Sequence, residues 1–130
     1  MTHAPIPEEL RRFVLTSIPS VPFLEALLLL RADPAQQWDG AMLAGRLYTR
    51  EKLAQGLLDD LCRAGMARRS DPPAAAGYLY APASAALRER IDRLADLYAR
   101  HLVEVTHLIH STLDRKAQQF ADAFKLRKDA

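Results

Sequence analysis

The sequence predicts a mainly α protein with one small β-hairpin, and three observations support this fold class. Its eight prolines leave residues 35–71 and 83–130 without proline, so long helices can run there. In both stretches apolar residues recur at the three- and four-residue spacing of a helix. Residues 66–81 instead hold two short segments around a proline- and alanine-rich stretch, a pattern typical of a hairpin.

Length and composition indicate one globular domain in a reducing compartment. The chain has 130 residues and 49% of them are hydrophobic, so it can bury a proper core. Its single cysteine, Cys62, cannot form an internal disulfide. The longest apolar stretch contains Pro22 and Glu25 and falls short of the ~20 residues that span a bilayer. The amino terminus lacks a secretory signal pattern, so we expect a cytoplasmic protein with no membrane partner.

Two helices are expected in the amino-terminal third of the chain. The second of them begins at Ser20 or Val21, with Pro22 in its first turn. Residues 23–32 are apolar nearly all round, so this helix should be central and buried. The first helix follows Pro7, and its apolar face consists of Leu10, Phe13, Val14 and Ile18.

A short helix, a tight turn and a longer helix come next. Asp39 is expected to cap the short helix, and Thr49 is expected to cap the longer one, which runs to about Ala64. Gly65 is well placed as the left-handed residue that ends it. The short helix carries Met42, Leu43 and Leu47, and the inward stripe of the longer helix is expected to be Leu53, Ala54, Leu57, Leu58 and Leu61.

Residues 66–69 and 77–81 are expected to form the two strands, with Tyr78 and Tyr80 on one face and Leu79 on the other. Helix, short helix, turn, helix and hairpin is the element order of a winged helix-turn-helix. We divide the chain, as one compact unit, into three parts: an amino-terminal helix (1–19), the winged helix-turn-helix domain (20–82) and carboxy-terminal dimerisation or docking helices (83–130).

The carboxy-terminal part is expected to hold a long helix capped by Ser84 and, after a break near Ser111, a final helix. The long helix carries two seam residues per heptad. An exposed seam of this kind invites pairing with a second copy, which we favour, and the alternative is a helix that packs only within its own chain. The seam consists of Leu87, Ile91, Leu94, Tyr98, His101, Val105 and Leu108, and the apolar face of the final helix consists of Leu113, Ala117, Phe120 and Phe124.

The second helix of such a motif can enter the major groove of double-stranded DNA, where donors meet base edges and cations meet phosphates. Two-fold pairing would place two such helices about 34 Å apart, one turn of DNA. The candidate DNA-contacting residues lie off the buried stripe or at the hairpin base: Thr49, Arg50, Lys52, Gln55, Gly56, Arg68 and Arg69.

Acidic residues in the same segment oppose this interpretation. Glu51, Asp59 and Asp60 repel phosphate, and residues 49–69 carry five cations and three anions, a balance of +2. So few phosphate contacts would give weak binding per protomer. An alternative therefore stays open: a protein–protein interaction module that docks on another regulator or on the transcription machinery.

Other chemistry has little support in the sequence. His101, Glu104, His107 and His110 recur every three residues, but each step drifts by about 60° around a helix, so at most a neighbouring pair such as Glu104 and His107 could share an ion. A complete site would need ligands from another helix or chain. We expect no metal and no cofactor, and His101 is expected to be a core or interface imidazole. Cys62 is expected to be an inert buried thiol. Because no phosphate loop, nucleophile elbow or paired-carboxylate motif is found, no enzymatic activity is expected.

Residues 20–82 resemble winged-helix transcriptional regulators of the MarR/PadR kind. The resemblance is carried by "DGAMLAGRLYTREKLAQGLLDDLCRAGMARR" and by "GYLYAP", and the whole chain resembles small bacterial winged-helix proteins. The chain departs from the pattern at Asp59 and in its wing tip, "SDPPAAAG", which lacks an arginine. The resemblance implies dimerisation through terminal helices, and by position it nominates for DNA contact Arg50, Lys52, Gln55, Arg68 and Arg69.

The sequence thus predicts a bacterial transcription regulator. It is expected to be a homodimer that binds a short, palindromic DNA site through the recognition helix and the wing.

Overall fold

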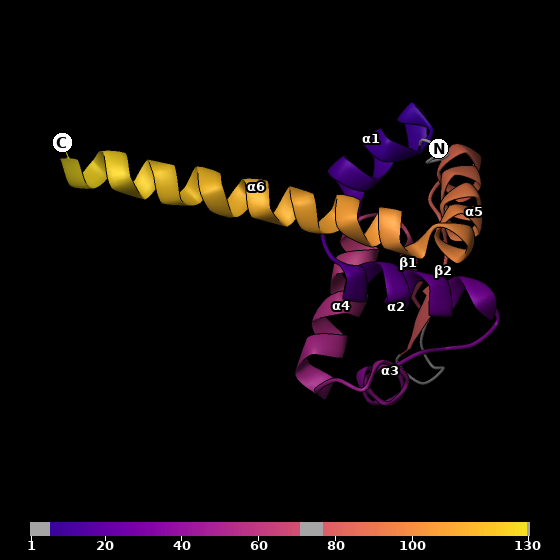
Figure 1. The fold of residues 1–130 in the computed structure, drawn as a ribbon. Coiled ribbons are helices and arrows are strands. Elements are labelled where there is room, and N and C mark those ends of the chain that lie inside the picture. Colours follow the sequence, from indigo (N-terminus) through magenta and orange to yellow (C-terminus); the bar gives the residue numbers. More distant parts are fainter. Residues whose placement is uncertain (1–5, 71–76, 130) are drawn as a thin grey trace.

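The computed structural model describes residues 6–70 and 77–129, apart from the side chains of 112–115 and 124–129. Its elements follow the predicted order and confirm a mainly α fold with a small hairpin (Figure 1). They are α1 (Glu8–Ser17), α2 (Val21–Ala32), α3 (Gly40–Leu47), α4 (Glu51–Arg63), β1 (Ala67–Arg69), β2 (Tyr78–Tyr80), α5 (Ala85–Arg100) and α6 (Leu102–Asp129).

Short polar side chains fix the starts of three helices. The side-chain oxygens of Ser20, Asp39 and Ser84 each accept a hydrogen bond from the backbone N–H three residues later, at 3.2, 2.8 and 3.1 Å. Each bond satisfies an amide that the first helical turn leaves without a partner. These three caps agree with the sequence prediction.

The cap predicted at Thr49 is wrong. Arg50 is the residue that precedes α4, and its side chain makes no capping hydrogen bond. The reason lies two residues before Arg50, where Tyr48 adopts the left-handed conformation (φ 55°) that ends α3. The amide of Thr49 still bonds back to the carbonyl of Ala44 at 3.1 Å, so α4 begins later than expected.

The end of α4 follows the prediction. Gly65 has a φ of +75°, a left-handed conformation that glycine adopts without a Cβ clash. The amide of Gly65 bonds to the carbonyl of Cys62 at 3.0 Å, and that of Met66 bonds to the carbonyl of Leu61 at 2.9 Å. This pair of bonds is a Schellman motif, and it turns the chain from α4 directly into β1.

The core is built around α2, which packs against α3, α4 and β2. Each fully buried leucine or phenylalanine contributes about 1.5–3 kcal/mol relative to an exposed one. Helix α2 is apolar nearly all round because neighbours cover it on several sides. Its buried residues are Phe23, Leu24, Ala26, Leu27 and Leu30.

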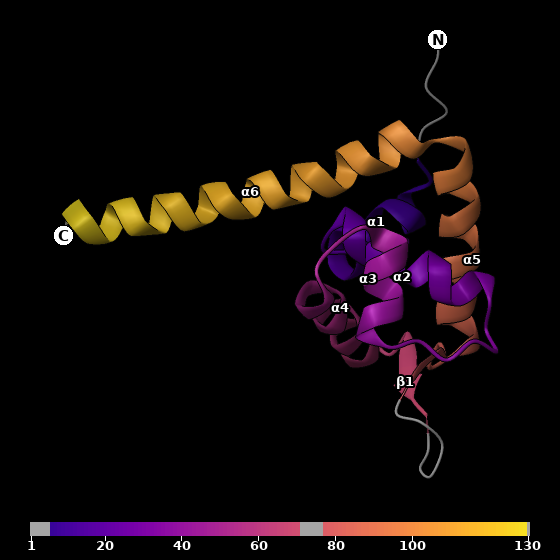
Figure 2. The same cartoon turned by 90° about the horizontal axis from the view of Figure 1, so that it is seen from below.

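Strands β1 and β2 pair antiparallel, with Ala67 opposite Tyr80 and Arg69 opposite Tyr78. Trp38, in the segment between α2 and α3, adds an isolated bridge: its amide bonds to the Tyr78 carbonyl at 2.8 Å, and the reciprocal bond is 2.7 Å. The hairpin leaves the helical body at the end remote from α6 (Figure 2). Trp38 therefore ties the wing to the helix-turn-helix.

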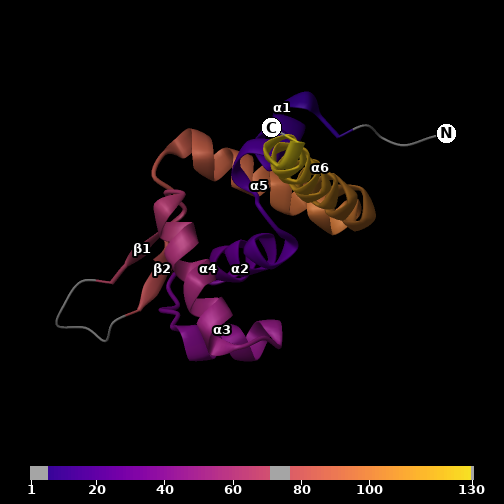
Figure 3. The same cartoon turned by 90° about the vertical axis from the view of Figure 1, so that its left-hand side faces the viewer.

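Helices α1, α5 and α6 pack against one another at one end of the molecule, whereas α3 and α4 lie at the other (Figure 3). Two polar contacts join α5 to the central helix α2. Arg31 pairs with Asp92 at 2.8 Å, and the Tyr98 hydroxyl donates to Glu25 Oε1 at 3.0 Å.

The helix break predicted near Ser111 is wrong. Helix α6 passes through Ser111 without interruption, and the chain breaks instead at His101, whose backbone is not helical (φ −132°, ψ 52°). The spacing of the apolar seam continues across His101, so periodicity did not reveal the turn. The turn buries Val105 and Ile109, while the rest of α6 extends away from the body (Figure 1).

Within the described ranges, no single helix is both long enough and apolar enough to cross a bilayer.

Candidate nucleic-acid interface

Helices α3 and α4 pack closely and form the predicted helix-turn-helix. The buried arc of α4 is centred on Ala54, Leu58 and Leu61. Leu53 was predicted to point inward, and this is wrong, because half of its surface is exposed (50%). Successive residues of a helix are rotated by about 100°, so Leu53 lies at the edge of this arc, about 100° from Ala54.

The residues predicted to contact DNA differ in exposure. Arg50 and Lys52, at the start of α4, are exposed, as are Arg68 and Arg69 on β1. The remaining three, Thr49, Gln55 and Gly56, are half-buried. The structure therefore presents two pairs of cations, one on the recognition helix and one on the wing.

Gln55 and Asp59 on α4 join Tyr78 on β2 in one hydrogen-bonded network. The Tyr78 hydroxyl donates to Asp59 Oδ1 at 2.6 Å and accepts from Gln55 Nε2 at 2.7 Å. Gln55 Nε2 also lies 3.4 Å from the same carboxylate oxygen. Asp59 is thus an acceptor for the buried wing tyrosine, which explains an acidic residue on this helix, and Gln55 supports the same contact.

Electrostatics around Tyr78 keep its hydroxyl protonated. Burial raises the pKa of Tyr78 above its ordinary value, and the hydrogen bond to Asp59 raises it further. The guanidinium of Arg69 lies 5.3 Å from the centre of the Tyr78 ring, a cation–π distance. The pairing of Arg69 with Tyr78 across the hairpin brings this cation to the Asp59 network.

Asp60, the second acidic residue that opposes DNA binding, forms an ion pair within α4. Its carboxylate pairs with the guanidinium of Arg63, one turn further along α4. Both groups are well exposed, so this pair contributes little to stability. It nevertheless partly neutralises the negative charge of Asp60 on the outward flank of α4.

Two hydrogen bonds between Ser70 and Gly77 close the base of the wing. The amide of Ser70 bonds to the Gly77 carbonyl at 2.8 Å, and the amide of Gly77 bonds to the Ser70 hydroxyl at 3.0 Å. The arginine-poor wing tip, residues 71–76, lies outside the described residues. The described part therefore fixes the direction in which the wing leaves the body.

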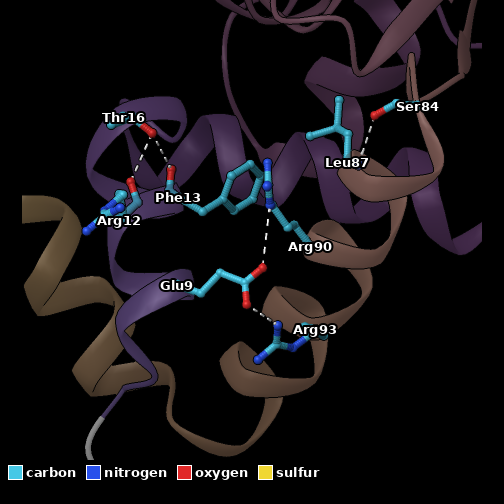
Figure 4. Close-up of polar contacts among 8 residues, drawn as sticks. All are labelled: Glu9, Arg12, Phe13, Thr16, Ser84, Leu87, Arg90 and Arg93. Carbon is cyan, nitrogen blue, oxygen red and sulfur yellow. Dashed lines mark hydrogen bonds and ion pairs between the residues drawn. The ribbon is translucent and has the colours of Figure 1, made fainter.

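A charged clamp joins α1 to α5 at the opposite end of the molecule (Figure 4). Glu9 lies between Arg93, at 2.8 Å, and Arg90, at 3.7 Å. The hydrogen bond from Arg93 and its positive charge hold the pKa of Glu9 below its ordinary value. A hollow of about 440 Å³ lies beside the clamp and includes Arg12 and Thr16 in its lining. The clamp fixes the amino-terminal helix against the carboxy-terminal ones.

The histidine series and Cys62 form no site with the described residues. His101 Nδ1 lies 2.9 Å from Glu104 Oε2, a contact within the α5–α6 turn. No group of three or more His, Cys, Asp or Glu residues in the described part of the chain is arranged to hold a metal ion. Cys62 is half-buried, and burial raises the pKa of its thiol, which disfavours the reactive thiolate.

No protein-family model and no curated protein matches the sequence. The solved structures that are similar to the chain include the following two. RV1404 from Mycobacterium tuberculosis shares 15% identity with a TM-score of 0.49, over 84% of this chain and 65% of that one. A MarR family protein from Bacillus stearothermophilus shares 16% identity with a TM-score of 0.48, over 88% of this chain and 84% of that one.

The chain therefore spans 65% of the length of RV1404. Its winged helix-turn-helix fold is established by its own element order, α3–α4 packing and hairpin register.

The apolar seam of the carboxy-terminal helices was predicted to be exposed, and this is wrong for most of it. Four seam residues are buried within the chain: Ile91, Leu94, Tyr98 and Val105. Two others, Leu87 and Leu108, pack partly buried against the same core, and His101 is half-buried in the turn. Among the described side chains of α6, the large apolar ones that are exposed are instead Leu102, Val103 and Phe120.

Two features of this interface were not predicted from the sequence. Trp38 bridges to Tyr78 from a loop 40 positions away in the chain, and Asp59 meets Tyr78 across 19 positions. A lone buried-type tyrosine on a strand and a lone acidic residue on a helix are each common. Only their meeting in space marks them as a pair.

Proposed function

We propose that this chain is a DNA-binding transcriptional regulator, a homodimer that binds a short palindromic operator through α4 and the wing. The observation that carries the proposal is the outward flank of α4, which the described residues leave uncovered. Arg50 and Lys52 are exposed there, while Asp59 and Asp60 are engaged by other side chains of the same chain. Two of the three acidic residues that opposed DNA binding, Asp59 and Asp60, thus have partners.

The residues divide by chemistry. Arg50 and Lys52 at the start of α4 suit phosphates on one side of the major groove, and Arg68 and Arg69 suit the backbone beside the wing. We assign the surface that faces the bases to Thr49, Gln55 and Gly56, which are half-buried.

A second copy of the chain is the proposed partner of α6. A single helix that extends from the body with exposed apolar residues is rarely stable alone in water. Val103 and Phe120 are 68% and 73% exposed. A two-fold pair along α6 would cover them and hold two recognition helices at a fixed separation.

Binding of the protein to fragments of genomic DNA at two salt concentrations tests the DNA-binding proposal. The variant Arg50→Ala/Arg68→Ala/Arg69→Ala is compared with Arg11→Ala/Arg12→Ala/Arg100→Ala, which removes the same charge from α1 and α5. Each lost phosphate contact should reduce the slope of log affinity against log salt by roughly 0.9. Salt-sensitive binding that only the first variant loses supports the regulator.

The alternative, a protein–protein interaction module, is favoured by one observation: the apolar surface around Leu53 on α4. Equal and negligible retention of DNA by all three proteins would support this alternative and reject DNA binding. The docking surfaces would then be the outward face of α4 or the α6 segment that carries Phe120 and Phe124, the latter residue having a side chain outside the described ones.

A further inference from the structure

Leu53 is an apolar side chain on a helix flank that otherwise carries charge. It lies in the first turn of α4, directly after Lys52, and half of its surface is exposed. A single exposed leucine is unremarkable on a protein surface. The hollow that Leu53 lines, and the charges around that hollow, distinguish this leucine from other exposed ones.

Leu53 lines a hollow of about 420 Å³ on the outward flank of α4. The floor is apolar and consists of Leu53, Gly56 and Leu57. A Cβ atom added to Gly56 would meet no other atom within 4 Å, so packing within the described chain does not require glycine there. Alanine would favour the helix by about 1 kcal/mol. Glycine at this position therefore keeps the floor of the hollow open at a cost to the helix.

Charges border the apolar floor. Arg50 and Lys52 line one end of the hollow, and Asp60, paired with Arg63, lines the other. The hollow thus combines an apolar floor with exposed cations at the start of the helix. The major groove of DNA offers matching groups. The phosphates at its edges match the cations, and the thymine 5-methyl is an apolar group among its base edges that matches the floor.

We propose that this hollow receives thymine 5-methyl groups, so that Leu53 selects A·T base pairs in the major groove. The inference rests on the proposed function, because it requires α4 to enter that groove. Its occupant is double-stranded DNA, since a purely apolar peptide would leave the cations at the rim without counter-charge.

The experiment starts from a random-sequence duplex library, from which the full-length protein enriches its preferred sequence. That duplex is then synthesised with deoxyuridine in place of thymidine at one position at a time, which removes only the 5-methyl group. Wild-type affinity should fall about fourfold at each position whose methyl group the hollow buries. Affinity is measured by fluorescence anisotropy at fixed salt.

Three variants assign the effect to the hollow. Leu53→Ala should bind thymidine and deoxyuridine duplexes equally, whereas Leu53→Met, which restores an apolar contact, should recover the difference. Met42→Ala is the matched control, because Met42 is a similarly exposed apolar residue (40%) on α3 that does not line the hollow. Circular dichroism verifies that each variant is folded.

The outcomes separate the two proposals. Enrichment followed by a thymidine preference that only Leu53→Ala loses supports methyl recognition. Enrichment with no effect of deoxyuridine, or with an effect that persists in Leu53→Ala, overturns methyl recognition and leaves DNA binding intact. No salt-sensitive enrichment overturns the proposed function and methyl recognition with it.

Discussion

The backbone conformation of Tyr48 lowers the stability of the turn between α3 and α4. It holds a left-handed conformation while its side chain is 96% exposed, so little packing offsets the strain. Asparagine tolerates this conformation better than other residues with a Cβ. Tyr48→Asn is expected to raise the free energy of unfolding by about 0.5–1 kcal/mol, measured by urea denaturation. Tyr48→Ala keeps the strain, so an equal gain in that variant would contradict this explanation.

The hydroxyl of Tyr78 makes stability depend on alkaline pH. Its pKa in the folded chain is raised, by burial first and then by Asp59, above the ordinary value of 10.0. The unfolded chain loses this proton at lower pH, so the associated stability is complete below about pH 10 and is lost as the pH rises through the folded-state pKa.

Tyr78→Phe should therefore show a shallower loss of stability above about pH 10 than the wild type, in urea titrations at each pH. The loss should not vanish, because burial also raises the pKa values of Tyr80 and Tyr98. Asp59→Asn is the companion variant and should move the alkaline transition in the same direction. If the free energy of unfolding of both variants depends on pH as in the wild type, the Tyr78–Asp59 network does not cause the loss of stability above about pH 10.

At the scale of the element, two glycines of the α4 region make a matched pair. Gly56 lies inside the helix with open space around it, whereas Gly65 needs its φ of +75°. Gly56→Ala is expected to raise stability by about 0.5–1 kcal/mol and Gly65→Ala to lower it by about 1 kcal/mol. Thermal unfolding of both variants checks the signs. Changes of the same sign would show that helix propensity and left-handed strain do not dominate here.

The clamp between α1 and α5 should make the packing of these elements sensitive to acid. The pKa of Glu9 is lowered from 4.5, mainly by Arg93, so the ionised carboxylate stabilises the folded chain above the unfolded-state pKa. That contribution is lost as the pH falls through the lowered folded-state pKa. Glu9→Gln should be less stable than the wild type at pH 7, and the difference should disappear in acid.

Hydrogen exchange of α1 amides measures this difference locally. Glu8→Gln, which makes the same change of charge in the neighbouring residue, is the control. Equal effects of the two substitutions would indicate a general charge effect on α1 in place of the specific clamp.

At the scale of the whole molecule, α6 is the element that reaches beyond the body. If a second copy covers its exposed apolar residues, a charge at Phe120 should dissociate the pair. Phe120→Glu is expected to sediment as a monomer at micromolar concentration while its helix-turn-helix body stays folded, because position 120 lies outside the core. Met42→Glu places the same charge on α3 and should remain a dimer. A wild-type protein that sediments as a monomer would reject the dimer.

Local interactions let the sequence determine most of the elements. The caps Ser20, Asp39 and Ser84 and the left-handed Gly65 act within four or five residues of the chain, so their types and spacing were sufficient. Apolar periodicity likewise identified the helices before residue 83 and the tyrosine face of the hairpin, since it depends only on the rotation per residue.

Tertiary packing decided which element covers each face of a helix, and this cannot be predicted from the residue pattern of the helix alone. Periodicity places Leu53 beside an apolar stripe, but in the folded chain half of its surface stays exposed. The seam residues look the same whether their partner is α1 or a second copy, and the chain's own turn at His101 settled which of them are buried. The pairing of Asp59 with Tyr78 arose in the same way, because the energy of a contact between distant residues depends on a distance that only the folded chain defines.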